Sequence, residues 1–144
     1  MAELSYAGLV TGVESILKAA PTLAAVHVTQ ELDAPTEFPW VTVRLARVTR
    51  RPFHIVSSLI AGSPDEVTAS LLLVCYEMSA QGAADAGRMR EILVRAVVDV
   101  LRTDPTLGQR VDYANVTQVD FAEEPGEAAI YAKAAVSVDC VVLA

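Results

Sequence analysis

The chain has little of what catalysis or metal binding requires. It contains two cysteines and two histidines, and its seven glycines are scattered. It has no Gly-rich phosphate-binding loop, no Gly-x-Ser-x-Gly segment and no His-Glu-x-x-His segment. Cys75, Cys140, His27 and His54 show no recognised metal-ligand spacing. We therefore expect a protein that is not an enzyme and that has no catalytic residue, no metal ion and no cofactor.

Two groups of residues are weaker candidates for chemistry. Ser57 and Ser58 lie near His54, but no third residue completes a nucleophilic triad. A set of carboxylates around an expected hairpin is a formal candidate for acid–base chemistry or metal binding. Their irregular spacing fits a solvated acidic edge better, and they are Asp112, Asp120, Glu123, Glu124 and Glu127.

The cysteines and the first residues bear on the compartment. Cys75 and Cys140 lie inside strand-like segments, which is typical of small buried hydrophobic residues. The start Met-Ala-Glu-Leu lacks the basic segment of a secretory signal, so we expect a reducing compartment. No apolar run reaches the roughly 20 residues that span a bilayer, and we expect no membrane partner.

Length and hydropathy favour one well-buried domain. At 144 residues the chain fits a single domain, residues 1–144. Apolar residues make up 53% of it, and the mean hydropathy is +0.39. A buried sheet and an interface with another subunit explain this apolar excess equally well.

Charge is unevenly distributed along the chain. The net charge is −7, which argues against a protein that binds the phosphate backbone of nucleic acid. Segment 38–64 holds four of the 11 basic residues and none of the 18 acidic ones, so it carries +4 while the rest carries −11. Such a separation favours pairing between copies, basic surface to acidic surface. The alternative is a strand and loop that are basic and simply solvated.

Periodicity predicts the order of the elements. Alternating apolar residues indicate strands, and apolar residues that recur every three or four positions indicate helices. The expected helices are Glu3–Ala20 and Ala83–Arg102, and the expected strands are Leu23–Gln30, Trp40–Thr49, Val67–Met78, Val111–Phe121 and Ile130–Val142. Together they define an α+β fold: a mostly antiparallel β-sheet packed against two helices, with a long loop or extended hairpin between the second and third strands.

Two segments have features beyond the fold class. The middle of Val67–Met78 is apolar on both faces, so we expect the N-terminal helix or a neighbouring subunit to cover the face opposite the main helix. Arg50–Asp65 has no clear period and is far longer than the usual hairpin connection. Long loops with apolar side chains are uncommon unless they bind something. The alternative is a loop that folds back on its own domain.

Short phrases in the chain match a known family. Phe38–Val43 is a strand entered through a proline, Thr103–Gly108 follows the main helix, and Val119–Glu124 precedes a final strand, Tyr131–Val142. In these phrases and in the order of its elements, the chain resembles the tail terminator (tail completion) proteins of long-tailed, non-contractile phages and gene transfer agents. The likeness spans most of the chain.

The resemblance implies a structural virion protein of the tail and neck region, assembled in the host cytoplasm. Such proteins form a homo-oligomer, a hexameric ring, at the head-proximal end of the tail tube. The ring would stop tube growth and bind both the tail tube protein and the head connector or stopper protein. DNA would pass through it without specific binding, and a negative lumen would let it slide.

A closed ring requires a head-to-tail interface, for which the separated charges are a physical basis. We expect the basic residues to meet the acidic ones, and the loop Phe53–Ile60 to contact the tube or the next subunit. The candidate interface residues are Arg44, Arg47, Arg50, Arg51, Phe53, Ile55, Leu59, Ile60, Asp120, Glu123, Glu124 and Glu127.

Three other functions remain open from the sequence. One is another ring component of the neck or tail, either a head–tail connector or a tail tube subunit. The second is a small-ligand-binding α+β domain, which predicts a concave pocket with convergent polar groups. The third is a dimeric accessory protein that pairs through an open edge of the sheet.

Overall fold

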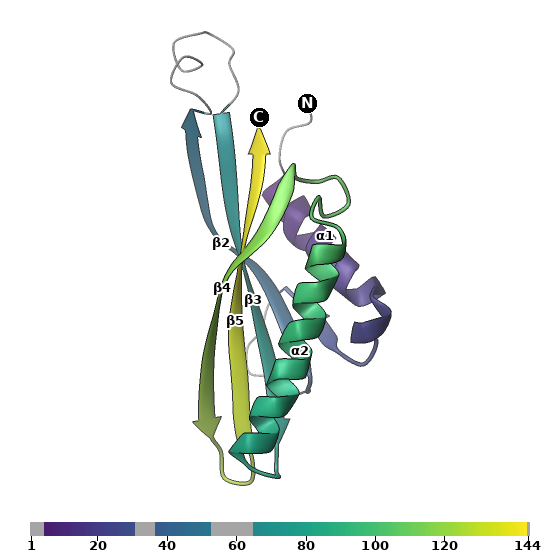
Figure 1. Cartoon of the computed structure of the whole chain (residues 1–144), viewed down its shortest axis with the longest axis vertical. Helices are drawn as coiled ribbons and strands as arrows, with labels where there is room; N and C mark the ends of the chain where they lie inside the picture. Colours follow the sequence, from purple (N-terminus) through teal and green to yellow (C-terminus); the bar gives the residue numbers. More distant parts are fainter. Residues whose placement is uncertain (1–4, 31–36, 53–64, 144) are drawn as a thin grey trace.

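Five strands form one sheet, and two helices lie on one of its faces (Figure 1). The computed structural model describes residues 5–30, 37–52 and 65–143. The elements are α1 Tyr6–Ala19, a 3₁₀ turn η1 Pro21–Leu23, β1 His27–Thr29, β2 Trp40–Pro52, β3 Asp65–Ser79, α2 Ala83–Thr103, β4 Tyr113–Pro125 and β5 Ile130–Leu143. The predicted α+β class, with a mostly antiparallel sheet and two helices, is confirmed.

The strands are ordered β1-β2-β3-β5-β4 across the sheet. β1 pairs parallel to the start of β2, and all other pairs are antiparallel. The longest ladder joins β3 to β5 without a break, from Glu66 opposite Leu143 to Ser79 opposite Ile130. β2 and β3 pair as far as Pro52 and Asp65, so the extended hairpin is confirmed up to these two residues. The loop residues Phe53, Ile55, Leu59 and Ile60 lie outside the described residues.

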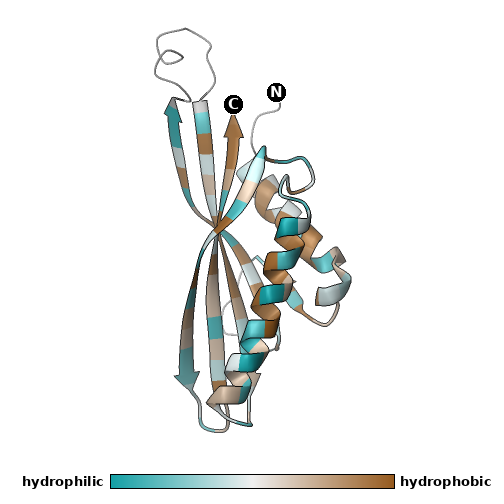
Figure 2. Ribbon diagram, in the orientation of Figure 1, coloured by the Kyte–Doolittle hydropathy of each residue, from teal (hydrophilic) through white to brown (hydrophobic). Residues whose placement is uncertain are grey.

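The core lies between the sheet and the helices. Every second residue of β5 from Ala132 to Cys140 is buried, as the alternation of this strand predicts. The helices contribute apolar stripes whose fully or nearly fully buried members include Val13, Leu17 and Val97. Figure 2 shows these stripes as brown bands on the helices. Both ends of α2 have the predicted charges, Asp85 in the first turn and Arg102 in the last.

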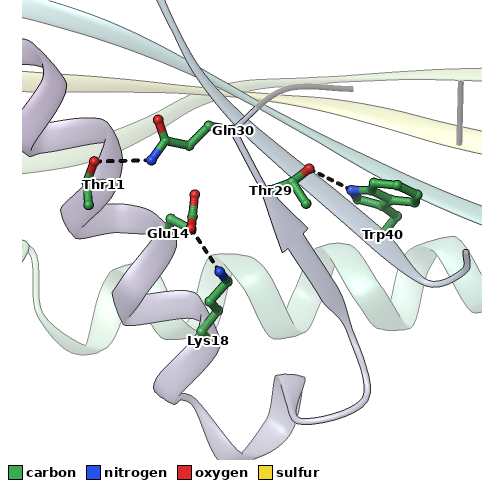
Figure 3. A network of polar contacts seen from close by, with 6 residues as sticks. All are labelled: Thr11, Glu14, Lys18, Thr29, Gln30 and Trp40. Carbon is green, nitrogen blue, oxygen red and sulfur yellow. Dashed lines mark hydrogen bonds and ion pairs between the residues drawn. The ribbon is translucent and has the colours of Figure 1, made fainter. Parts of the chain in front are cut away.

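Polar contacts attach α1, β1 and β2 to one another (Figure 3). The side-chain amide of Gln30 donates to the Thr11 hydroxyl of α1 at 3.1 Å. The indole N–H of Trp40 donates to the Thr29 hydroxyl at 2.8 Å and so joins the end of β1 to the start of β2. Three residues of parallel pairing are few, and these side chains add to the attachment of β1.

Several predicted boundaries are corrected. The expected strand Leu23–Gln30 contains only His27–Thr29, because Pro21 fixes its own backbone and opens a 3₁₀ turn that includes Leu23. α1 begins at Tyr6, since the Ser5 hydroxyl accepts the backbone N–H of Gly8 at 3.1 Å and caps the helix. β2 continues through Arg50 and Arg51 to Pro52, because its pairing with β3 extends beyond the residues that alternate between apolar and polar.

The turn after α2 is built around Asp104. One carboxylate oxygen accepts the backbone N–H of Thr106 at 3.1 Å and its hydroxyl at 2.6 Å. The other accepts the backbone N–H of Gly108 at 2.8 Å. These hydrogen bonds hold the pKa of Asp104 below its usual value, and the bond from the Thr106 hydroxyl has the largest effect. They also stabilise a backbone with positive φ at Leu107, Gly108 and Gln109.

We predict that Asp104→Ala lowers the melting temperature at pH 7, because the turn loses three hydrogen bonds. A carboxyl whose pKa is lowered by folding stabilises the fold above its ordinary value of 3.8, and this contribution is lost as the pH falls below it. The difference from the wild type should therefore shrink in acid. The exposed Asp99→Ala on α2 is the matched control, measured by thermal unfolding between pH 7 and pH 3. An equal effect of both substitutions would contradict the role of Asp104.

Candidate interaction surface

The face of the sheet opposite the helices is not covered by any element that the structure describes. α1 and α2 both pack on the other face, so the prediction that the N-terminal helix covers this side is wrong. Its central strand, β3, presents half-buried side chains here, among them Leu72, Val74 and Tyr76. We call this surface the open face. Of the two covers predicted from sequence for this face, a neighbouring subunit is the one that remains.

The half of the open face near the β4–β5 hairpin is apolar. A hollow of about 230 Å³ lies there, lined mainly by the apolar residues Val74, Tyr76, Phe121, Ala122 and Ala135 and also by the charged residues Asp120 and Lys133. We call it the apolar hollow.

Large side chains at the same end of the sheet add to this apolar surface. Met78 and Tyr131 are each 37% exposed, and Tyr131 stacks at an angle against Phe38 with ring centroids 5.8 Å apart. Exposed apolar groups of this size, gathered in one place, are typical of a contact surface.

The other half of the open face is polar. A hollow of about 370 Å³ is lined by side chains that include Arg47, Arg51, Thr68, Asn115 and Asp139. Within it, the Ser70 hydroxyl donates to the Asp139 carboxylate at 2.7 Å. We call this the polar hollow.

The predicted basic residues all lie on β2. Arg44, Arg47 and Arg51 face the open side, opposite Leu72, Ser70 and Glu66 of β3, whereas Arg50 is opposite the buried Val67. A bulge between Leu45 and Arg47 shifts the register at this point.

The arginines on the open face differ in their partners within the subunit. Arg51 pairs with Glu66 at 2.9 Å. Among the described residues, no acidic partner lies within bonding distance of Arg44 or Arg47. Two exposed cations are therefore available to a partner.

The predicted acidic residues lie in the second half of β4 and in the hairpin that follows. Glu123 pairs with Arg90 of α2 at 3.0 Å, and Glu124 pairs with Lys133 of β5 at 3.3 Å. These two carboxylates are thus engaged within the subunit. Asp120 accepts only the Gln118 amide, at 2.7 Å, and neither it nor Glu127 has a cationic partner among the described residues.

The outermost basic and acidic residues lie at opposite ends of the sheet. Arg51 is opposite Glu66 at one end of β3, and Glu124 is opposite Tyr131, which is opposite Met78 at the other end. At about 3.4 Å per residue, the steps from Glu66 to Met78 span roughly 40 Å. One molecule cannot bring Arg51 and Glu124 together. Arg44 and Asp120 are nearer along the strands, since they lie in the rows of Leu72 and Val74, but β3 and β5 separate their strands. A contact between the outermost members of the two groups therefore requires two copies.

Sequence reasoning missed Arg90, which anchors α2 to the edge strand. Its guanidinium donates to the Ala122 carbonyl at 3.1 Å and lies 4.9 Å from the centroid of the Phe121 ring. With the Glu123 ion pair, it holds β4 to the helix. Nothing in the helical pattern marks it, because the contacts depend on where β4 lies.

The candidates His54, Ser57 and Ser58 lie outside the described residues. Within residues 5–30, 37–52 and 65–143, no group of three or more potential metal ligands comes together. Cys75 and Cys140 are buried, as predicted, and burial raises the pKa of both thiols to about 12. His27 is half-exposed and lies 3.1 Å from Glu37. No described helix is long and apolar enough to cross a membrane.

Glu77 is the one acidic side chain among the buried residues of the described segments. It lies on the helix-covered face and is 7% exposed. Its Oε1 has no hydrogen-bond partner among the described residues. Burial raises the pKa of this carboxyl, and a hydrogen bond with the Met78 backbone offsets part of that rise. The charged form is therefore disfavoured in the folded protein.

Comparison with known proteins gives matches among solved structures alone. No family model and no curated protein matches the chain. A chain of a solved structure described as "Virion of native gene transfer agent (GTA) particle" is similar, at 13% identity and a TM-score of 0.47, over 99% of this chain and 100% of that one. At this level of similarity, the match supports no conclusion about the function of this chain.

We predict that Glu77→Gln stabilises the protein at pH 7 by about 1 kcal/mol, since it removes a buried charge that lacks a full set of partners. For a chain of this size, that is roughly 2–4 °C in melting temperature. A carboxyl whose pKa is raised by folding costs stability when ionised, so the gain should vanish as the pH falls towards its ordinary value of 4.5. The exposed Glu91→Gln on α2 is the control. A lower melting temperature for Glu77→Gln at pH 7 would show that the carboxylate stabilises the fold.

Proposed function

We propose that the chain is a tail terminator of a phage-type tail. In this proposal, copies of the chain form a ring, of six subunits by the family resemblance, at the head-proximal end of the tail tube. The ring stops tube growth and joins the tail to the head connector or stopper protein. It belongs to the neck region of the virion and is assembled in the host cytoplasm.

The observation that carries the proposal is the separation of opposite charges to the two sides of an uncovered sheet. Arg44 and Arg47 lie exposed on β2, whereas Asp120 lies on β4 and Glu127 in the hairpin after it, with β3 and β5 in between. A contact between these unlike sides is head-to-tail, and head-to-tail contacts close into rings when the rotation between neighbours allows it. Many proteins form rings through such contacts. The resemblance of the sequence to tail terminators favours this function over that of other ring-forming proteins.

The net charge of −7 supports the passage of DNA through the ring. A negatively charged lumen repels the phosphate backbone and keeps the DNA from adhering. DNA is therefore cargo that slides through the ring, and the specific partners are the tail tube protein and the head connector or stopper protein.

Two other candidate functions have distinct outcomes. A head–tail connector or tail tube subunit would use the same kind of head-to-tail contact, but a tube subunit would polymerise into open-ended tubes. The polar hollow of about 370 Å³ favours a small-ligand-binding domain as the candidate from another class. Such a domain would stay monomeric and would melt at a higher temperature when its ligand is added.

We predict that the double substitution Arg44→Glu and Arg47→Glu abolishes ring formation without unfolding the subunit. Like charges at a contact cost several kcal/mol, so association should weaken by at least about tenfold. Light scattering over a concentration series, with negative-stain images of the same samples, measures ring formation. Capping of purified tail tubes measures the terminator function separately.

The control replaces two cations outside the proposed contact, Arg88→Glu and Arg95→Glu, on the exposed side of α2. A second variant, Asp120→Lys with Glu127→Lys, should fail alone but assemble when mixed with the arginine-reversed chain, because the charges are exchanged. Unchanged assembly of the arginine-reversed chain would refute the charge contact. Rings that never cap a tail tube would refute the terminator function while leaving the contact intact.

A further inference from the structure

We propose that the apolar hollow of one subunit binds the segment 53–64 of a second copy of the chain. This inference rests on the proposed function only in assuming a head-to-tail oligomer of this chain. It identifies the surface that receives the loop, whereas the sequence predicts only that the loop contacts some other molecule.

The composition of the segment matches the hollow. Segment 53–64 contains five large apolar residues and no acidic residue, and it directly follows Arg50 and Arg51. The hollow offers Val74, Tyr76 and Ala135 for apolar contact. Burial of a Phe, Ile or Leu side chain removes its apolar surface from water and stabilises a contact, so one or two inserted side chains would anchor the complex.

Charge favours the same pairing. Asp120 borders the hollow, and Glu127 lies in the hairpin beyond it. Neither has a cationic partner among the residues that the structure describes. A segment that enters from the basic end of another copy brings arginines towards these carboxylates. Positive and negative surfaces steer such an encounter and fix its orientation.

Distance excludes the hollow of the same subunit. The segment leaves the sheet at Pro52 and returns at Asp65, which are opposite each other. A segment of this length that leaves and returns at one place reaches at most about 20 Å, because half of its residues lead outwards at no more than roughly 3.5 Å each. Val74 lies nine residues along β3 from Asp65, which is roughly 30 Å. The occupant must therefore come from another copy.

The contact is tested with two variants that are each expected to be defective. In the first, a short Gly-Ser turn replaces segment 53–62, which leaves the hollow intact. In the second, Ala135→Arg fills the hollow with a bulky cation and leaves the segment intact. Thr117→Arg, at an exposed position in the polar half of the same face, is the matched control for the second variant. Thermal unfolding establishes that each variant is folded.

Sedimentation of the purified chains measures how they associate. We expect the wild type and Thr117→Arg to associate as the concentration rises, and each defective variant to stay monomeric. An equimolar mixture of the two defective variants should form a 1:1 dimer and nothing larger, since each pair retains a single functional contact. Should Ala135→Arg not fold, Val74→Lys replaces it in the same mixture.

Three outcomes would overturn the inference. The first is a mixture that stays monomeric, and the second is unchanged association of either defective variant. The third is a wild type that is monomeric up to its solubility limit while removal of the segment abolishes tail capping, which would make the tail tube the occupant. Because sedimentation needs no tail, failure of the terminator function alone leaves the dimer of the mixed variants unaffected.

Discussion

The continuous pairing of β3 with β5 is the constraint on which the other features depend. Neighbouring residues of a strand point to opposite faces, so one register assigns every side chain of both strands. In this register Leu71, Leu73 and Val136 face the helices, while Leu72, Val74 and Ala135 face outwards. A shift of one residue would exchange the two sets and place Lys133 and Asp139 beneath the helices. The buried face therefore fixes the open face, and the apolar hollow is a consequence of how the core is filled.

The same antiparallel geometry produces the charge separation. β2 runs towards the end where Arg51 lies, and β4 runs towards the opposite end, where its carboxylates lie. Each subunit thus has two unlike ends, and unlike ends favour head-to-tail contacts over symmetric dimers. The outer edge of β4 carries Asp120, Glu123 and Glu124 and is interrupted by a bulge between Val116 and Gln118. Charges and bulges on an edge strand oppose unspecific strand pairing, which counts against a dimer formed through that edge.

Strongly periodic segments were predictable from sequence, and segments held by tertiary contacts were not. The α2 helix and β5 were predicted to within a residue or two, because their patterns extend over more than ten positions. The length of β1 was overestimated, because the apolar residues before it also fit a 3₁₀ turn packed on the core. Of the two alternatives for the cover of the open face, the N-terminal helix was wrong and a neighbouring subunit stays a prediction. An amphipathic helix has one apolar face, and its sequence does not say which side of the sheet that face covers.

The sequence by itself determined the α+β class, the buried cysteines and the grouping of basic residues in one segment, because these follow from local periodicity and composition. Only the tertiary structure decided that both helices share a face, that Glu123 is held by Arg90 while Asp120 faces outwards, and that Arg51 and Glu124 lie at opposite ends of the sheet. These features depend on which strands become neighbours. Burial of the whole sheet selects these neighbours, because the sequence of one segment does not determine which other strands it pairs with.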